Sequence, residues 1–352
     1  MRGLVKFALG PDGVALQELP EPIPQEGELK VKVLATSICG SDIHAMYDER
    51  AVTIPVVMGH EYVGQVVETC GDVGDFQVGD WVLTLPACYS CGTCDLCKAG
   101  LVTLCKERKS IGSHRNGAMA NYLVVPARYS YKVPVDAVSR EDKIVYALTE
   151  PLACVVRGVC EKCHVTAGDT VVVSGPGVMG QFAAQVFKAM GAYVIVSGLP
   201  TVAEKLELAK SLGADETVTG FDELEKAVYA HNPDGADITC EATGVTPSLK
   251  ACMQVIRPMG THLQLGMYGG EVPFRLDYMF DREVNYVPSN STATSSWEIT
   301  LKLLSEKKVT MRPFVTMQVP LEDWKSAFDA VIQKKVYKAI LLPDNEFNFS
   351  QV

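Results

Sequence analysis

The first third of the chain alternates apolar and polar positions over short distances. Residues 29–33 read Leu-Lys-Val-Lys-Val, and residues 62–68 continue the pattern with a glycine inside the run. An alternation with a period of two is typical of a strand that buries one face. The sequence therefore predicts a β-rich first domain built from short strands and turns.

A different pattern begins near residue 144, and from residue 169 onward valine-rich runs alternate with helix-like segments. This alternation predicts βαβ units and hence a parallel sheet. We expect strands at 170–174, 192–197, 237–241, 261–266 and 338–342, and helices at 180–190, 203–212, 297–306 and 321–333. Residues 170–187 carry no charge, but their glycines and proline favour a buried strand, a turn and a helix over a membrane span.

Composition limits the class of protein. A length of 352 residues corresponds to about two domains. With 47% hydrophobic and 21% charged residues, the chain is not a disordered or fibrous protein. A net charge of −10 disfavours nucleic acid and anionic membranes as partners. Residues 1–7 lack a secretory signal profile, so we expect a cytoplasmic protein whose twelve cysteines stay reduced.

A glycine-rich loop follows the strand predicted at 170–174. Gly175, Gly177 and Gly180 match G-x-G-x-x-G, with Val178 and Met179 between the last two glycines. In this strand–turn–helix context the motif indicates a dinucleotide site, because the glycines let a pyrophosphate approach the helix N-terminus. A glycine-rich turn without a ligand is the alternative.

The tip of the next predicted strand bears on the choice of dinucleotide. NAD sites usually place an acidic residue there to bind the ribose hydroxyls. Here the strand ends in Ser197 and Gly198, and the first acid afterwards is Glu204. Ser197 and Lys205 are candidate partners for a 2′-phosphate. The sequence therefore favours NADP as the cofactor, or the use of both NAD and NADP. Lys205 as an ordinary solvated lysine is the alternative.

Four cysteines fall within fifteen residues, at Cys91, Cys94, Cys97 and Cys105. Four thiolates at this spacing favour a structural zinc site, which leaves no open position for chemistry. An iron–sulfur cluster and a metal-free reduced loop are the alternatives. Cys88 precedes the cluster and is not needed as a ligand.

Three further segments carry potential chemistry, although each is a weak indication by itself. They are residues 39–44 (Cys-Gly-Ser-Asp-Ile-His), residues 59–64 (Gly-His-Glu-Tyr-Val-Gly) and residues 150–152 (Glu-Pro-Leu). A lone cysteine or histidine is more often a packed core group than a ligand. In this order, ahead of a dinucleotide loop, the segments resemble the zinc-containing medium-chain dehydrogenase/reductase family, and the resemblance covers essentially the whole chain.

The resemblance implies an α/β architecture in which a GroES-like, β-rich catalytic domain is joined to a doubly wound Rossmann domain. We expect the catalytic domain at 1–152, with the zinc lobe at 88–106. The NAD(P)-binding domain is expected at 153–287, and a segment that returns to the catalytic domain at 288–352. Family members are commonly dimers or tetramers, so the resemblance also implies a homo-oligomer, with residues 274–296 contributing to the oligomer contact and the substrate pocket.

Site roles follow from the same resemblance. Cys39, His60 and Glu150 resemble the ligands of the catalytic zinc, with Glu150 binding directly or through water. Glu61 resembles the family glutamate that lies beside the zinc and can replace water as a ligand. Asp42 would orient His60 from behind.

The resemblance also implies a proton path. Ser41 resembles the hydroxyl that takes the proton from the substrate alcohol, and His44 resembles the relay that passes it toward solvent. A turn or capping hydroxyl is the alternative reading of Ser41. The implied reaction is reversible oxidation of an alcohol with hydride transfer to NAD or NADP, and two zinc ions per chain.

Glu150 at the third ligand position favours the sorbitol/L-iditol-like polyol branch, which oxidises a secondary alcohol of a sugar alcohol to a ketose. A polyol-phosphate dehydrogenase is one alternative, because the loop around Arg115 resembles the Gly-Ser-x-Arg-x-Gly loop of galactitol 1-phosphate dehydrogenases, where Arg115 could bind a phosphate or carboxylate. An ordinary solvated loop arginine is the other interpretation of Arg115. A threonine 3-dehydrogenase-like enzyme is another alternative, although its strand-tip acid is missing here. The filled ligand positions disfavour a non-catalytic NADPH-binding relative, and Glu150 disfavours a simple-alcohol or formaldehyde dehydrogenase.

Overall fold

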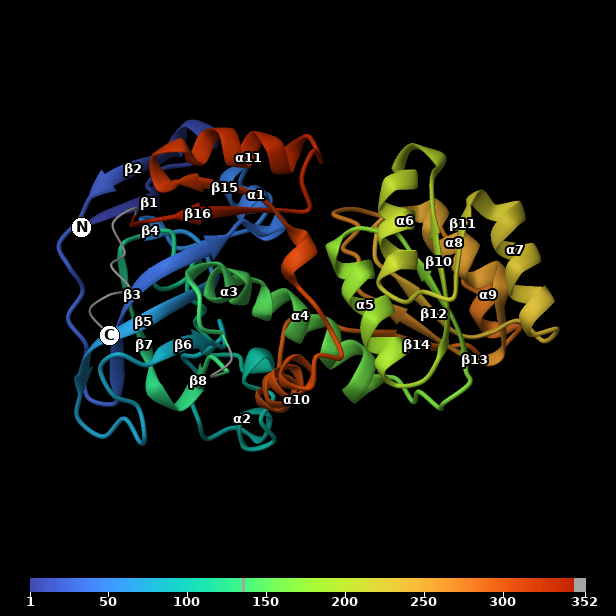
Figure 1. Cartoon of the computed structure of the whole chain (residues 1–352), viewed down its shortest axis with the longest axis horizontal. Coiled ribbons are helices and arrows are strands. Elements are labelled where there is room, and N and C mark those ends of the chain that lie inside the picture. The colour runs from blue at the N-terminus through green and yellow to red at the C-terminus, as the bar shows by residue number, and fades with distance from the viewer. Residues whose placement is uncertain (135–136, 345–352) are drawn as a thin grey trace. The chain divides into compact units, whose positions relative to one another are not determined.

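The computed structural model describes residues 1–134 and 137–344, and it divides into two compact units (Figure 1). Unit 1 comprises Met1–Pro151, Thr292–Trp297 and the chain from Met311 onward, and unit 2 comprises Leu152–Ser291 and Glu298–Thr310. The domain limits expected at 152/153 and 287/288 stay a prediction. Residues 345–352 of the expected returning segment, and residues 135 and 136, lie outside the described residues.

Unit 1 is built on two sheets. A small sheet has the strand order β2-β1-β4, and a larger one has the order β15-β16-β3-β5-β6-β8, with β7 paired to β3. The strands are β1 (Arg2–Lys6), β2 (Val14–Glu18), β3 (Glu28–Ser37), β4 (Val56–Val57), β5 (Glu61–Cys70), β6 (Trp81–Thr84), β7 (Tyr122–Pro126), β8 (Ser130–Lys132), β15 (Val315–Pro320) and β16 (Lys338–Leu342).

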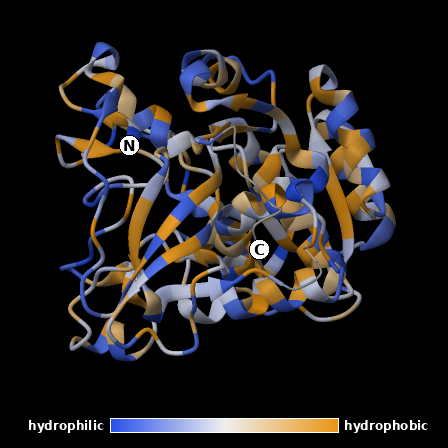
Figure 2. Cartoon of the chain, turned by 60° about the vertical axis from the view of Figure 1, so that its left-hand side comes forward, coloured by the Kyte–Doolittle hydropathy of each residue, from blue (hydrophilic) through white to orange (hydrophobic). Residues whose placement is uncertain are grey.

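The predicted alternation in the first third of the chain is confirmed. Leu29, Val31 and Val33 of β3 are completely buried in one apolar cluster, together with side chains from β5, β6 and β7. Figure 2 shows the pattern as alternating hydrophilic and hydrophobic segments along the strands. The strand predicted at 338–342 is also confirmed, and as β16 it pairs antiparallel with the end of β3.

The helices of unit 1 pack around these sheets. A second cluster gathers Ile38, Met58 and Leu341 beneath Trp324 and Phe328 of the last helix. The helices that lie wholly in this unit are α1 (Gly40–Met46), α2 (Asp95–Lys98), α3 (Arg140–Val145) and α11 (Trp324–Ile332). The boundaries between the units fall within or beside α4 (Thr149–Val156) and α10 (Thr294–Ser305).

Unit 2 contains a six-stranded sheet in which every strand pair is parallel, with the order β11-β10-β9-β12-β13-β14. Its strands are β9 (Thr170–Ser174), β10 (Tyr193–Gly198), β11 (Glu216–Thr219), β12 (Ala236–Glu241), β13 (Ile256–Gln264) and β14 (Asn285–Pro288). The four strands predicted here are confirmed, while β11 and β14, at the two edges, were not predicted.

Helices cover both faces of this sheet. Val172 of β9 packs in a cluster with α7 and α8, whereas the neighbouring Val173 contacts Gly180 of α5. Because successive side chains of a strand point to opposite faces, α5 lies on the face opposite α7 and α8. The predicted doubly wound arrangement is therefore confirmed. The helices of unit 2 are α5 (Val178–Ala189), α6 (Ala203–Ser211), α7 (Gly220–His231), α8 (Thr246–Val255) and α9 (Asp277–Phe280).

The uncharged run at 170–187 forms β9, a turn and most of α5, as the glycines and proline predicted. Within the described ranges, no helix combines the length and the apolar character needed to cross a membrane.

Candidate active site

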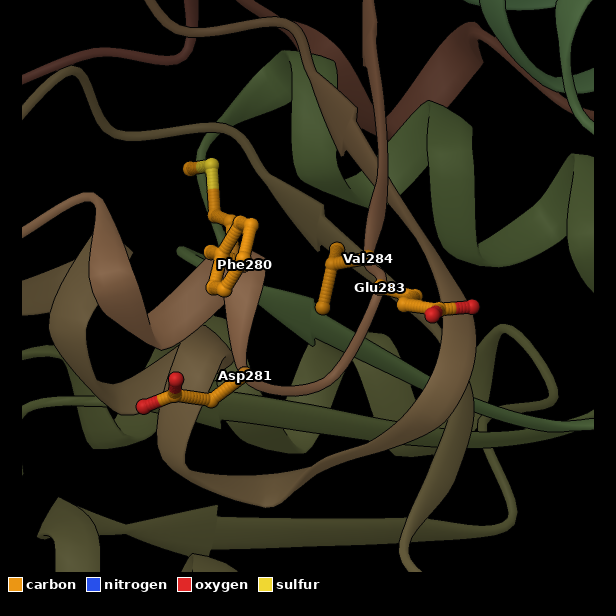
Figure 3. Close-up of a pocket in the computed structure, with 5 residues that line it drawn as sticks. Phe280, Asp281, Glu283 and Val284 are labelled. Atoms are coloured by element: carbon orange, nitrogen blue, oxygen red, sulfur yellow. The ribbon is translucent and has the colours of Figure 1, made fainter.

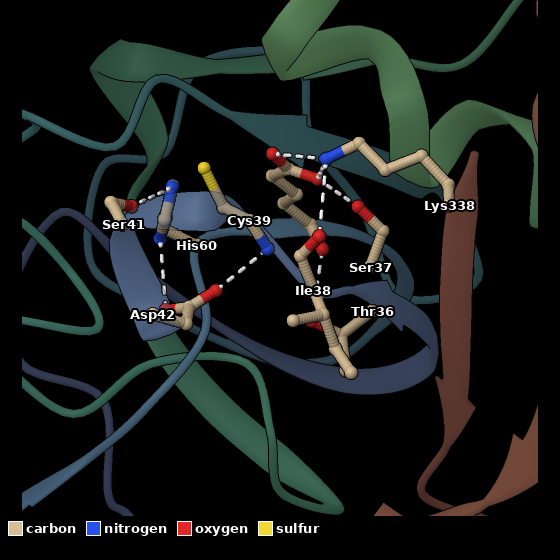
Figure 4. Close-up of polar contacts among 9 residues, drawn as sticks. Thr36, Ser37, Ile38, Cys39, Ser41, Asp42, His60 and Lys338 are labelled. Atoms are coloured by element: carbon tan, nitrogen blue, oxygen red, sulfur yellow. Dashed lines mark hydrogen bonds and ion pairs between the residues drawn. The ribbon is translucent and has the colours of Figure 1, made fainter. Parts of the chain in front are cut away.

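The first group of candidate residues lies where β3 ends and α1 begins. Cys39 precedes α1, and its backbone N–H donates to the Asp42 carboxylate over 2.9 Å. This contact closes the first turn of the helix and fixes the Asp42 side chain. The other Asp42 oxygen lies 3.6 Å from Nδ1 of His60 (Figure 4). Asp42 therefore orients the imidazole ring through the nitrogen opposite Nε2, as expected.

His60 and Glu61 reach the same place from the start of β5. Cys39, His60 and Glu61 each offer a ligand atom, and these three atoms lie within 4.8 Å of one another. The preceding Gly59 has a φ of +88°, and a Cβ there would lie 2.6 Å from a side-chain atom of Met119. Glycine is therefore required for the turn that delivers His60.

Two groups flank the imidazole of His60. Ser41 Oγ lies 3.5 Å from Nε2, and Asp42 lies beside Nδ1. Burial by itself would lower the pKa of His60, but the nearby Asp42 carboxylate raises it well above the ordinary value. A positive charge on this ring is therefore stabilised, and a divalent cation at Nε2 would benefit from the same carboxylate.

Glu61 is held by a lysine from the far end of the chain. Lys338 Nζ lies 2.6 and 2.8 Å from the two Glu61 oxygens, and it also donates to Ile38 O over 3.2 Å. Ser37 Oγ donates to the same carboxylate. Both members of the ion pair are buried, with exposed side-chain fractions of 7% and 1%. Figure 4 shows Lys338, Ser37 and Ile38 in this network of polar contacts.

Glu150 lies in α4 and is buried. It falls outside the set of ligand atoms within 4.8 Å of one another, yet it contributes to the raised pKa of Lys338. Burial alone would lower that pKa, and the carboxylate of Glu61 is the main group that raises it. Glu150 is therefore part of the same electrostatic environment.

His44 lies in the last turn of α1 and is partly exposed to solvent. Its Nδ1 is 2.6 Å from the carboxylate of Glu49, and both side chains are substantially exposed, at 38% and 62%. An imidazole in such a place can exchange protons with water.

The set around Cys39 suits a zinc ion chemically. One thiolate, one imidazole and nearby carboxylates are the donor types that zinc binds in catalytic sites with an open position. The residues present therefore fit the metal that the sequence predicts.

The four-cysteine lobe forms a second cluster. The ligand atoms of Cys91, Cys94, Cys97 and Cys105 lie within 4.8 Å of one another, and Cys91 Sγ is 3.8 Å from Cys97 Sγ and 3.6 Å from Cys105 Sγ. A tetrahedral site with Zn–S bonds of about 2.3 Å has sulfur–sulfur edges of about 3.8 Å. The thiols are thus spaced for one tetrahedral ion.

The protonation of these thiols agrees with that spacing. Backbone N–H groups of Cys94 and Thr93 lower the pKa of Cys91 to about 6. The backbone N–H of Cys97 also favours the Cys94 thiolate, but the neighbouring thiols raise the pKa of Cys94 to about 11. A bound cation would favour the Cys94 thiolate by offsetting the effect of the neighbouring thiols. Cys88 is separate, since burial raises its pKa to about 12.

The predicted cofactor loop connects β9 to α5 in unit 2. Gly175 has a φ of +104° and donates to Ser197 O over 2.8 Å, and a Cβ on Gly180 would lie 1.9 Å from Gly175 O. A Cβ on Gly177 would meet nothing within 4 Å. Two glycines are thus required for close packing, while the third leaves open space at the N-terminus of α5, where Val178 and Met179 begin the helix.

The end of β10 lies beside this loop. Gly198 packs against Pro176, Ser197 is buried, and Lys205 follows in α6. The backbone carbonyl of Lys205 accepts a hydrogen bond from Gln181 of α5. The strand tip therefore carries a hydroxyl and a glycine where NAD sites place a carboxylate.

Comparisons with known proteins agree with both units. Residues 25–135 match the alcohol dehydrogenase GroES-like domain, and residues 178–306 match the zinc-binding dehydrogenase domain. The chain is 36% identical over 345 residues to D-arabitol-phosphate dehydrogenase of Enterococcus avium, covering 97% of each protein. It belongs to the zinc-containing medium-chain dehydrogenase/reductase family. Sorbitol dehydrogenase of Halalkalibacterium halodurans is 35% identical, over 97% of this chain and 99% of that protein.

A solved structure gives the same result for the whole chain. A Sinorhizobium meliloti protein determined with bound NADP superposes with a TM-score of 0.86 at 29% identity, over 97% of this chain and 99% of that one. The family and its polyol dehydrogenase branch are therefore established, and with them zinc-type alcohol dehydrogenase activity.

Sequence reasoning missed two residues of the site. Neither Ser37 nor the role of Lys338 was predicted, although both bind Glu61. A lysine opening the otherwise apolar strand at 338–342 was the available indication, since a buried lysine needs a carboxylate. Arg115 lies apart from the donor set, with its guanidinium 4.2 Å above the ring of Tyr89.

Proposed function

We propose that the protein is a zinc-dependent NAD(P) oxidoreductase that reversibly oxidises a secondary alcohol of a sugar alcohol to a ketose. The observation that carries the proposal is the convergence of Cys39, His60 and Glu61 in a chain of the polyol dehydrogenase branch. A polyol-phosphate substrate is the second candidate, favoured by the similarity to an arabitol-phosphate dehydrogenase.

In this proposal Cys39, His60 and Glu150 hold the catalytic zinc, with Glu150 acting directly or through water. Zinc bound there would supply Lewis acidity that lowers the pKa of the substrate hydroxyl. Asp42 fixes the ring of His60, and Lys338 holds Glu61 beside the site. Glu61 is then available as a further ligand only when the lysine releases it.

Ser41 accepts the proton of the substrate hydroxyl in this proposal. Its Oγ lies 3.5 Å from His60 Nε2, so the hydroxyl is next to the donor set. His44, whose Nδ1 lies 2.6 Å from the Glu49 carboxylate, then passes the proton toward solvent. Loss of the hydroxyl proton leaves an electron pair on the substrate oxygen that forms the carbonyl, and bound NAD or NADP would supply the acceptor for the hydride that leaves the carbon.

The cofactor proposal rests on the loop from Gly175 to Gly180. The pyrophosphate would lie over Gly177 at the N-terminus of α5, where open space and free backbone N–H groups favour an anion. Ser197 and Lys205 would meet the 2′-phosphate of NADP, and the absence of a strand-tip acid supports NADP or dual use.

We also propose that Cys91, Cys94, Cys97 and Cys105 bind a structural zinc. The spacing of their sulfur atoms supports one tetrahedral ion per lobe. Its role would be to hold the lobe between residues 88 and 106 without taking part in the chemistry.

A homo-oligomer, either dimer or tetramer, is part of the proposal. β14 is an edge strand, and the segment before it forms a shallow pocket lined by Met279, Phe280, Asp281, Glu283 and Val284 (Figure 3). Phe280 is 82% exposed and Leu276 is 70% exposed. An apolar segment beside an open sheet edge suits a second copy of the chain.

One experiment tests the central claim. Initial rates of reduced cofactor formation would be measured with NAD and NADP against sorbitol, xylitol, arabitol, their phosphates, L-threonine and butanediol. We expect polyol oxidation that Cys39→Ser abolishes while the fold is retained. Turnover of threonine alone would overturn the substrate class, and a fully active Cys39→Ser variant would overturn the assignment of the catalytic site.

A further inference from the structure

Two loops of unit 1 run side by side next to the candidate active site. The first follows α1, and the second follows the cysteine lobe. Thr53 N donates to Ser113 O over 2.8 Å, which joins the loops, and Arg50 N donates to His44 O over 3.2 Å. The second loop also packs on the turn before His60, because a Cβ on Gly112 would lie 2.5 Å from Gly59 O.

These loops bring cations together. Arg108 is held by a hydrogen bond from Nη1 to Thr103 O, and its pKa is lowered by burial and by the positive charge of Arg50. His114 is exposed to the same positive charges. Burial is the main cause that lowers its pKa, and the charges of Arg108, Arg50 and Lys109 lower it further. We call Arg50, Arg108, Lys109 and His114 the cationic cluster.

Among the residues that the structure describes, no carboxylate neutralises the two guanidinium groups of this cluster. Within residues 1–134 and 137–344, neither Arg50 nor Arg108 has an acidic side chain within ion-pair distance. Of the nearest acids along the chain, Glu49 is bound to His44, and Glu107 lines the pocket of the cysteine lobe with Cys105. Two arginines that repel each other without a counter-charge favour binding of an anion.

We propose that the cationic cluster binds the phosphate of a phosphorylated polyol, whose hydroxyl group reacts at Cys39 and His60. Guanidinium groups bind phosphate through paired hydrogen bonds, and a phosphate monoester carries close to two negative charges. The cluster is built on the loop that follows His44 and on the loop that packs against Gly59. The cationic cluster and the candidate active site are therefore carried by the same backbone segments. This inference rests on the proposed function.

Arg115 is a poorer candidate for the same role. Its guanidinium is stacked on Tyr89, whose hydroxyl donates to Glu28 over 3.0 Å. Glu28 begins β3 and Ser37 ends it, which separates their backbones by about 30 Å at 3.3 Å per residue. The stacking partner of Arg115 is thus tied to the end of β3 that lies far from Ser37 and Glu61.

The test compares free and phosphorylated forms of the same polyol, with arabitol and arabitol phosphate as the first pair. The variants are Arg50→Gln and Arg108→Gln, singly and together. Each should lower kcat/KM for the phosphorylated form by about tenfold to a hundredfold, mainly through KM, because a hydrogen bond to a charged group is lost. Turnover of the free polyol should change less than about twofold, within the scatter of neutral surface changes.

Calorimetry supplies a readout that does not depend on turnover. Inorganic phosphate should bind the zinc-loaded wild type and compete with the phosphorylated polyol, and the double variant should lose both effects. Arg128→Gln is the matched control, since Arg128 is an exposed arginine of unit 1 stacked 4.7 Å from the ring of Tyr129. Unchanged zinc content and tryptophan fluorescence would show that each variant folds, and Arg50→Lys should retain part of the affinity.

The outcomes separate this inference from the proposed function. Equal activity on free and phosphorylated polyols in the wild type and in both variants would overturn the inference and leave the polyol assignment intact. A rise in KM confined to NADP, or an effect confined to threonine, would also overturn it, because the anion would then belong to the cofactor or to an amino acid. No turnover of any polyol would overturn the proposed function, while the phosphate titration would still decide whether Arg50 and Arg108 bind phosphate.

Discussion

The stability of unit 2 should depend on pH through one buried histidine. His262 of β13 accepts a hydrogen bond at Nδ1 from Thr239 over 2.8 Å, and its Nε2 donates to Gln264 over 3.2 Å. The tautomer is assigned from these partners. Burial lowers the pKa of His262 to about 4, although Gln264 and Glu241 partly offset the effect. The folded unit therefore holds a neutral imidazole at neutral pH.

The sign and size of the effect follow from the two states. The unfolded chain binds a proton near pH 6.5 and the folded unit only near pH 4. Between these values the unfolded state holds more protons, so the free energy of unfolding falls as the pH falls. The contribution is fully present above about pH 6.5. It decreases by about 2 kcal/mol between pH 7 and pH 5, and by about 3 kcal/mol once the pH is below 4.

The assay must report unit 2 separately. All three tryptophans, Trp81, Trp297 and Trp324, lie in unit 1, so their fluorescence follows that unit. Urea unfolding of unit 2 would instead be followed by pulsed hydrogen–deuterium exchange of peptides from β12 and β13. We expect His262→Gln to remove about 2 kcal/mol of the change between pH 7 and pH 5. His231→Gln, an exposed change in the same unit, keeps His262 and should keep the wild-type change.

One result would refute the reasoning. If the wild type and His262→Gln lose the same free energy of unfolding between pH 7 and pH 5, the imidazole is not held neutral by burial. Zinc loss at low pH would not produce a false positive, because both metal-donor sets lie in unit 1 and both proteins share them.

Three shorter predictions concern unit 1. Lys338→Met should lower the free energy of unfolding by about 3–5 kcal/mol in a fluorescence-detected urea titration, because it leaves the buried Glu61 carboxylate unpaired. The double variant Lys338→Met/Glu61→Gln should recover most of that loss of free energy. If it recovers none, Glu61 is not the group that Lys338 stabilises. Cys97→Ser should bind one zinc fewer per chain than the wild type by elemental analysis, whereas Cys70→Ser should match the wild type. Ser41→Ala should lower kcat by about 10²–10⁴-fold at unchanged zinc content, and an unaltered kcat would exclude its proton role.

The parts of the fold that the sequence predicted are those with strong local patterns. The strands at 170–174 and 338–342 were correct to the residue, and the helix at 180–190 differs from α5 only at its ends. β11 and β14 were missed because each has four residues and neither is a continuous apolar run. Edge strands are less buried than central ones, so their polar residues stay in contact with water and the apolar pattern is weak.

The donor sets show the same limit at the level of side chains. The cysteine lobe is local, so its spacing predicted a cluster that the structure then brought together. The pair between Glu61 and Lys338 spans 277 residues, and no local pattern contains both partners. A buried carboxylate is defined by its counter-charge, which only the tertiary structure supplies.

The arginines of unit 1 differ in what surrounds them, and that difference is not visible in the sequence. Sequence reasoning chose Arg115 because it lies in a glycine-containing loop, which is a local property. What makes an arginine available to a phosphate is the absence of a neutralising carboxylate, and that depends on the whole fold. Tyr89 covers Arg115, whereas Arg50 and Arg108 come from two loops that a hydrogen bond joins between Thr53 and Ser113, and the charge of Arg50 lowers the pKa of Arg108. The specificity of this enzyme for charged substrates would then be decided by residues that no motif marks.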